Sequence, residues 1–202
     1  MKPRLFVEQK ITAFTNIYKV FQTADSGDQG QLSALAQQKR LAFKEKITFY
    51  SDETKSAEVW TFRAEKILDV HGRYFVEDQN GQVIGMFKKE FKQSFITSTW
   101  TLMDVEGKDL FTVRESSTAL AFFRRYACWV PVVGEIIEIV TSFLRYHFVF
   151  TKVGSEEVVG KYQKTTLFRD HYTLSLTDDA YEACDWRVLA SFSVALDALQ
   201  SR

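Results

Sequence analysis

The sequence predicts a mainly β (α+β) protein whose antiparallel strands close into a barrel around a hydrophobic C-terminal helix. Segments that alternate apolar and polar residues run through much of the chain, and eighteen phenylalanines with only two prolines favour strands. The last segment, Trp186–Leu199, has helical spacing but is apolar nearly all round, as in a helix enclosed by protein. A meander of hairpins offers an apolar inner face, and its closure into a barrel removes exposed edges and encloses that helix.

Composition favours one domain, residues 1–202, and argues against several classes of protein. With 202 residues, of which 46% are hydrophobic, the chain can build one sizeable core. Its net charge of zero lacks the basic surplus of a nucleic-acid-binding protein. The N-terminal residues lack an apolar signal sequence, and Cys128 and Cys184 are too few for a disulfide scaffold. We therefore expect a cytoplasmic protein with reduced thiols and no nucleic-acid partner.

The N-terminal part contains strand-like segments and one segment of helical composition. Ile17–Phe21 resembles a strand, and the polar residues 25–30 favour a turn. The Ala, Leu and Gln content of Ser33–Ala42 predicts a helix. Lys46–Tyr50 and Glu58–Glu65 are predicted strands, the second with a clear period of two.

The middle of the chain carries an internal repeat, residues 74–84 and 100–110. In each copy an aromatic residue begins a strand and an Asp begins a turn, with Gly three residues later: Asp78 with Gly81, and Asp104 with Gly107. Gly supplies the positive φ that such a turn requires. A weaker third copy runs from residue 148 to 158. The repeat predicts successive hairpins.

The central helix is predicted within residues 179–200. Its large apolar residues are Val188, Leu189, Phe192, Val194, Leu196 and Leu199. Asp178, Asp179 or Asp185 is placed to cap its start. About fifteen residues rise roughly 22 Å, short of a bilayer core of about 30 Å, which favours enclosure by protein. Six such side chains, at about 1.5–3 kcal/mol each, contribute on the order of 10 kcal/mol gross, as much as a domain's whole stability.

These features resemble the superfamily of tubby C-terminal domains, phospholipid scramblases and LURP-one-related proteins. The resemblance is carried by the hairpin Tyr74–Gly81, by its echo around Asp104 and Gly107, and by the ending from Cys184 to Asp197. It implies a roughly twelve-stranded barrel around a central helix. Members of the superfamily bind phosphoinositides, are proposed to move lipids or have no known activity, which implies a non-enzymatic binding module.

Residues 119–145 do not fit the strand pattern and predict an apolar helical insertion, divided by Pro131 and Gly134. Its charged residues argue against a transmembrane helix. The side chains suited to a partner or membrane contact are Phe122, Phe123, Trp129, Phe143 and Leu144. Three interpretations stay open: packing over a barrel mouth, which is the simplest, contact with a membrane, and an oligomer surface.

No catalytic, cofactor or metal motif is recognisable. The sequence has no phosphate-binding Gly loop, no nucleophile elbow and no metalloprotease helix. His71, His147 and His171 are scattered without metal-ligand spacing. We expect neither an enzyme nor a bound cofactor.

Two charged groups are candidate sites. Lys88, Lys89, Lys92, Arg124 and Arg125 form a candidate lipid site, because tubby-like domains hold phosphoinositide headgroups with Lys and Arg on such a rim. The plainer interpretation is a solvated strand end. The acidic residues Asp170, Asp178, Asp179 and Glu182 occupy the place of a calcium-associated segment in scramblases. Their spacing does not match that segment, and capping with the helix dipole explains them.

We therefore expect a binding module that contacts anionic phospholipid at the inner membrane face, or a protein partner. One alternative is a structural protein that forms a homo-oligomer through residues 119–145. Another is a scramblase-like lipid transporter, whose function would require the final helix to enter the membrane and so compete with its burial.

Overall fold

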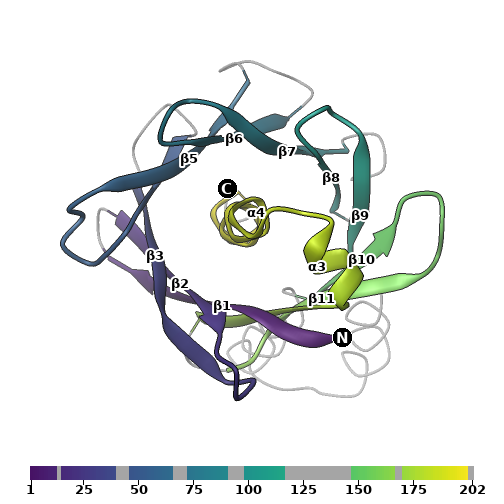
Figure 1. Cartoon of the computed structure of the whole chain (residues 1–202), viewed down its shortest axis with the longest axis horizontal. Coiled ribbons are helices and arrows are strands. Elements are labelled where there is room, and N and C mark those ends of the chain that lie inside the picture. The colour runs from purple at the N-terminus through teal and green to yellow at the C-terminus, as the bar shows by residue number, and fades with distance from the viewer. Residues whose placement is uncertain are drawn as a thin grey trace, which may run out of the picture.

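Twelve antiparallel strands close into a barrel around one long helix (Figure 1). The structure, a computed structural model of the whole chain, describes residues 1–12, 15–39, 46–65, 72–90, 98–116, 147–166 and 170–199. The strands are β1 (Lys2–Ile11), β2 (Thr15–Thr23), β3 (Gln29–Lys39), β4 (Lys46–Tyr50), β5 (Glu58–Ala64), β6 (Arg73–Asp78), β7 (Val83–Lys89), β8 (Thr99–Met103), β9 (Asp109–Glu115), β10 (His147–Lys152), β11 (Val158–Lys164) and β12 (Asp170–Leu176). The helices are α3 (Asp178–Glu182) and α4 (Trp186–Ala198). The predicted fold class is confirmed.

Each strand pairs with the next along the chain, and β1 pairs with β12 to close the barrel. The connections β2–β3, β4–β5, β6–β7, β8–β9 and β10–β11 therefore lie at one end, the turn end, where α4 begins. The opposite end, the far end, is where β1, β3, β5, β7, β9 and β11 finish. Figure 1 looks along the barrel, with α4 seen end-on at its centre.

The predicted repeat is confirmed as two hairpins with the same turn chemistry. Asp78 Oδ1 accepts hydrogen bonds from the amides of Asn80 (2.8 Å) and Gln82 (2.9 Å) in the β6–β7 turn. Asp104 Oδ1 does the same for Glu106 and Lys108, both at 2.9 Å, in the β8–β9 turn. Gly81 and Gly107 have φ of 77° and 83°, which favours glycine. The third copy is also a hairpin, β10–β11.

The helix predicted at Ser33–Ala42 is wrong, because residues 33–39 belong to strand β3. Ala34 and Ala36 pair with Val20 and Tyr18 of β2, and both alanines are fully buried on the inner face of the barrel. Their small side chains leave room for the larger groups around the helix. Pairing on both edges and burial on one face thus override the helical propensity of Ala, Leu and Gln. Residues 40–42 lie outside the described part of the chain. By contrast, the strands predicted at residues 46–50 and 58–65 are confirmed as β4 and β5, to within one residue.

Helix α4 is buried along almost its whole length. Val188, Leu189, Phe192, Val194 and Leu196 are each at most 1% exposed, and Leu199 is partly buried. Asp185 is its N-cap and accepts a hydrogen bond from the Arg187 amide at 2.8 Å, while Asp178 and Asp179 lie in the first turn of the short helix α3. The predicted span 179–200 thus contains two helices separated by residues 183–185.

Strands on different sides of the barrel contact α4. The Phe192 ring packs edge-on against Phe87 of β7, Trp100 of β8 and Phe150 of β10, with centroids 5.4, 5.8 and 5.9 Å away. Polar contacts complete the enclosure: Trp60 Nε1 donates to Ser191 Oγ at 3.0 Å, and Tyr162 Oη donates to the Ser193 carbonyl at 3.2 Å. Each buried polar group of this kind requires its partner, so these bonds also fix the rotation of the helix.

Candidate functional site

The two predicted lipid-site lysines that the structure describes both have partners at the far end. Lys88 Nζ lies 3.1 Å from Glu90 Oε1. Lys89 Nζ lies 5.6 Å from the centroid of the Trp100 ring, a cation–π contact. Lys92, Arg124 and Arg125 lie outside the described residues, as do Phe122, Phe123, Trp129, Phe143 and Leu144 of the predicted insertion. Of the predicted lipid site, the structure thus places Lys88 and Lys89, whose side chains have different partners.

Three further cations, which the sequence analysis did not single out, lie at the far end. Lys10 near the end of β1, Lys46 at the start of β4 and Arg114 near the end of β9 are exposed. Within the described ranges, no ion pair engages these three side chains. They leave positive charge around this rim of the barrel.

The acidic residues before α4 do not converge. Asp170 lies at the far end of β12, 2.7 Å from Lys164 Nζ. Asp178 lies beyond the other end of β12 and pairs with Lys2 and Arg4 of β1. Among the residues that the structure describes, no group of three or more His, Cys, Asp or Glu side chains is arranged to hold a metal ion.

A buried carboxylate lies at the far end of α4. Asp197 is 5% exposed and accepts hydrogen bonds from Tyr18 Oη at 2.8 Å and Tyr172 Oη at 3.2 Å. Burial raises the pKa of Asp197 to about 6, although the two tyrosine hydroxyls oppose the shift. Burial, together with the nearby Asp197 charge, also raises the pKa of Tyr18. The group anchors the last turn of α4 to β2 and β12.

The described cysteine is enclosed by protein. Cys184 is 7% exposed, and burial raises the pKa of its thiol to about 12. A thiol with such a pKa stays protonated near neutral pH, which agrees with a packing role and opposes a nucleophilic one.

An open pocket of about 340 Å³ lies at the turn end, between the first turn of α4 and strands β3 to β6. We call it the mouth pocket; its lining is Ser33, Ser51, Val59, Trp60, Asp78, Gln79, Trp186 and Arg187. Trp60 is fixed by stacking on Phe49, with centroids 4.5 Å apart, and by its bond to Ser191. Trp186 meets the Trp60 ring edge-on at 5.2 Å and remains partly exposed. The pocket thus has a rigid inner wall and an accessible indole.

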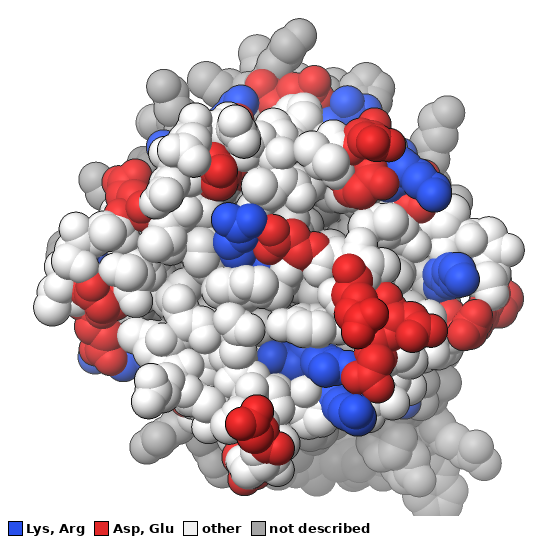
Figure 2. All heavy atoms as spheres, in the orientation of Figure 1, with Lys and Arg blue, Asp and Glu red and all other residues white. Residues whose placement is uncertain are grey.

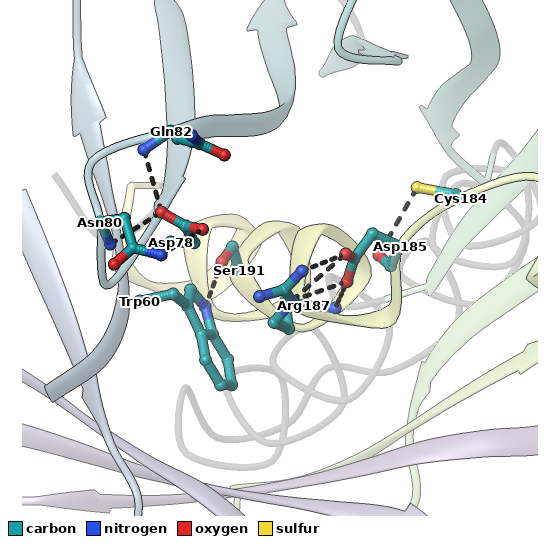
Figure 3. A network of polar contacts seen from close by, with 8 residues as sticks. All are labelled: Trp60, Asp78, Asn80, Gln82, Cys184, Asp185, Arg187 and Ser191. Atoms are coloured by element: carbon teal, nitrogen blue, oxygen red, sulfur yellow. Dashed lines mark hydrogen bonds and ion pairs between the residues drawn. The ribbon is translucent and has the colours of Figure 1, made fainter. Parts of the chain in front are cut away.

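Charged groups sit beside this indole wall (Figure 3). The Arg187 guanidinium donates through Nε and Nη2 to the Asp185 carboxylate at 2.6–3.2 Å, and Figure 3 shows its remaining nitrogen directed away from Asp185. Hydrogen bonds from the Gln82 and Asn80 amides lower the pKa of Asp78, with a smaller contribution from Arg187. Hydrogen bonding to Asp185 raises the pKa of Arg187, so Asp78 and Arg187 are both charged at neutral pH. The pocket edge has one more negative than positive charge.

Acidic side chains are spread around the turn end, with basic side chains between them (Figure 2). The hairpin turns and residues 177–185 contain Asp25, Asp28, Asp52, Glu53, Asp104, Glu106, Glu156, Glu157, Asp178, Asp179, Glu182 and Asp185. The basic residues of the same segments are Lys55 and Lys108. Although the whole chain is neutral, these turn segments thus carry an acidic surplus.

The repeated hairpins, the barrel and its buried helix agree with a match to the LURP-one-related family over residues 33–197. The chain belongs to the LURP-one-related family. Its relationship to the tubby-like and scramblase superfamily is consistent with this membership. No curated protein matched the chain in sequence. Within the described part of this LURP-one-related protein, no helix has the length and hydropathy needed to cross a membrane.

Sequence reasoning missed the mouth pocket of this LURP-one-related protein. Its residues come from four strands or turns and from α4, and Trp60 and Ser191, which fix its inner wall, are 131 residues apart in the chain. Residue spacing carries no signal for such a site. The hairpin Asp78 was recognisable for its local role, but only the closed barrel brings it to one pocket with Arg187, the partner of the helix cap Asp185.

Proposed function

We propose that this LURP-one-related protein is a non-enzymatic binding module that docks its far end onto anionic phospholipid. The observation that carries the proposal is the group of exposed cations at the far end, Lys10, Lys46 and Arg114, which no ion pair engages within the described ranges. Family membership supports a binding module of the tubby-like type. The protein would then act as a peripheral cytoplasmic protein at the inner membrane face.

The expected affinity follows from the number of cations. Each Lys or Arg near an anionic surface contributes about 1 kcal/mol, and the attraction falls off within a Debye length. Lys10, Lys46 and Arg114, with the more enclosed Lys89, therefore support weak, salt-sensitive binding. Lys88 contributes less, because Glu90 compensates its charge.

The chemistry of the described side chains supports the absence of catalysis. The Cys184 thiol is buried and protonated, and the Asp197 carboxylate is enclosed by Tyr18 and Tyr172. The Cys184 thiol is therefore not activated as a nucleophile, and the Asp197 carboxylate is not accessible to a substrate as an acid or base. A scramblase-like role would require α4 to leave contacts on several sides of the barrel, which disfavours that alternative.

Vesicle flotation tests the proposal. Vesicles with and without anionic lipid would be mixed with the protein at low salt, and flotation is expected only with the anionic vesicles. A triple variant, K10E/K46E/R114E, should lose flotation. The matched control K55E/K108E/K152E changes the net charge equally at the turn end and should float like wild type. Equal loss in both variants, or no flotation of wild type at low salt, would overturn the proposal.

A further inference from the structure

The mouth pocket combines features that suit a positively charged side chain. We infer that it binds an arginine or lysine side chain from a basic segment of a partner protein. This inference concerns the end of the barrel opposite to the proposed lipid surface, so a docked molecule would present the mouth pocket away from the membrane. It therefore goes beyond the proposed function and does not depend on it.

The aromatic wall supplies the first part of the argument. Trp186 is partly exposed, and its ring is held by edge-on contact with Trp60, which stacking on Phe49 and the bond to Ser191 fix in turn. Indole is the best aromatic partner for a cation, particularly for a planar guanidinium. The wall needs little ordering when a ligand arrives, because its inner ring is already buried and bonded.

The charges near the wall supply the second part. Arg187 is neutralised by Asp185, with bonds of 3.1, 3.2 and 2.6 Å, and Asp78, which also lines the pocket, adds a further negative charge. Hydrogen bonds from two backbone amides keep Asp78 ionised and fixed. Ser51 Oγ donates to Asp52 Oδ2 at 2.8 Å, and its oxygen can accept a hydrogen bond from a guanidinium or ammonium that projects past the indole.

The surrounding surface decides between ligands of opposite charge. The acidic turns produce a negative potential over the turn end, which attracts basic segments and repels phosphate or carboxylate ligands. The volume of about 340 Å³ lies within the range of small-ligand sites, enough for one long side chain. A basic protein segment satisfies both the pocket and the charged surface around it, whereas an anionic lipid satisfies neither.

Binding would be measured with labelled peptides of alternating Arg and Ser, Lys and Ser, or Glu and Ser, by fluorescence anisotropy without lipid. We expect the Arg peptide to bind best and the Glu peptide not to bind. The variant Asp78→Asn keeps an oxygen for both turn amides and should weaken Arg-peptide binding about fivefold. The matched variant Asp104→Asn makes the same change in the equivalent turn outside the pocket and should weaken binding by about twofold or less.

A second pair of variants tests the pocket rather than the charge. Ser51→Phe places a ring in the mouth pocket and should weaken Arg-peptide binding about tenfold or more. Ser155→Phe makes the same change in the exposed β10–β11 turn of the same end and should have no effect. Equal effects within both matched pairs would overturn the inference, since the acidic surface alone would then explain binding. Self-association that Ser51→Phe abolishes, without any peptide binding, would instead identify a second copy as the occupant.

Discussion

The closeness of the barrel wall to the enclosed helix predicts the outcome of adding a single methyl group at Gly85 of β7. A Cβ built on Gly85 would lie 2.7 Å from Val188 Cγ2 and 3.3 Å from Val188 Cγ1. Val188 is 1% exposed and belongs to the first turns of α4. Gly85→Ala therefore forces the wall and the helix apart, whereas an unenclosed helix would move away at no cost.

The magnitude follows from the contact distances. Carbon atoms pack at about 3.5–4.0 Å, so relief requires a shift of nearly 1 Å between two packed elements. Overpacking of this kind costs about 1–3 kcal/mol. Val188→Ala alone removes two buried methyl groups and should cost about 1.5–3 kcal/mol. In the double variant the methyl group at position 85 occupies the space that the Val188 side chain vacated. The overpacking cost of Gly85→Ala should therefore nearly disappear.

Urea unfolding of the wild type, both single variants and the double variant measures this coupling. The double variant should be about 1–3 kcal/mol more stable than the sum of the single changes predicts. A cost of fitting a side chain to the backbone at position 85 is the same in the wild type and in Val188→Ala, so it cancels from the coupling energy. Gly107→Ala is the control, because its Cβ meets no atom within 4 Å and should not couple to Val188→Ala. Additive single changes would refute the contact between wall and helix.

Two further predictions concern α4. Phe192→Ala removes a fully buried ring packed against three strands and should lower the free energy of unfolding in urea by about 3–5 kcal/mol, whereas a loss below about 1 kcal/mol would contradict its burial. The raised pKa of Asp197, about 6, means that the folded state keeps a proton that the unfolded state has lost, so its contribution to stability falls as pH rises from about 4 to 6. Relative to Asp197→Asn, the wild type should therefore lose about 2–3 kcal/mol between about pH 4 and 7, and parallel pH profiles of the two proteins would argue against a buried, titrating carboxylate.

Local chemistry allowed the hairpins and the helix to be predicted, because their signals lie within a few residues. Asp78 and Gly81 specify a turn whatever surrounds them, and Asp185 specifies a helix start. The apolar circumference of α4 then required an enclosure, which the closed barrel provides. The helix prediction for Ser33–Ala42 was wrong for the opposite reason. The segment has helical propensity, but β2 and β4 pair with β3 in a way that no local pattern reveals.

The candidate sites were less predictable than the fold. Lys88 and Lys89 are adjacent in sequence, yet one faces Glu90 and the other the Trp100 ring. Lys10, Lys46 and Arg114 are distant in the chain and share one rim only because alternate strands finish at the same end. The mouth pocket likewise depends on closure of the barrel. The chain has no net charge, and only the topology reveals that Lys10, Lys46 and Arg114 lie at one end of the barrel and the acidic turns at the other.

Native-state hydrogen exchange of α4 tests most directly whether the barrel is built around its own helix. The amides of residues 188–198 should exchange only through global unfolding, with an opening free energy equal to that from urea denaturation. Exchange of these amides at a clearly lower free energy than those of β6 and β7 would contradict the account, because α4 would then leave the barrel while the strands stay paired.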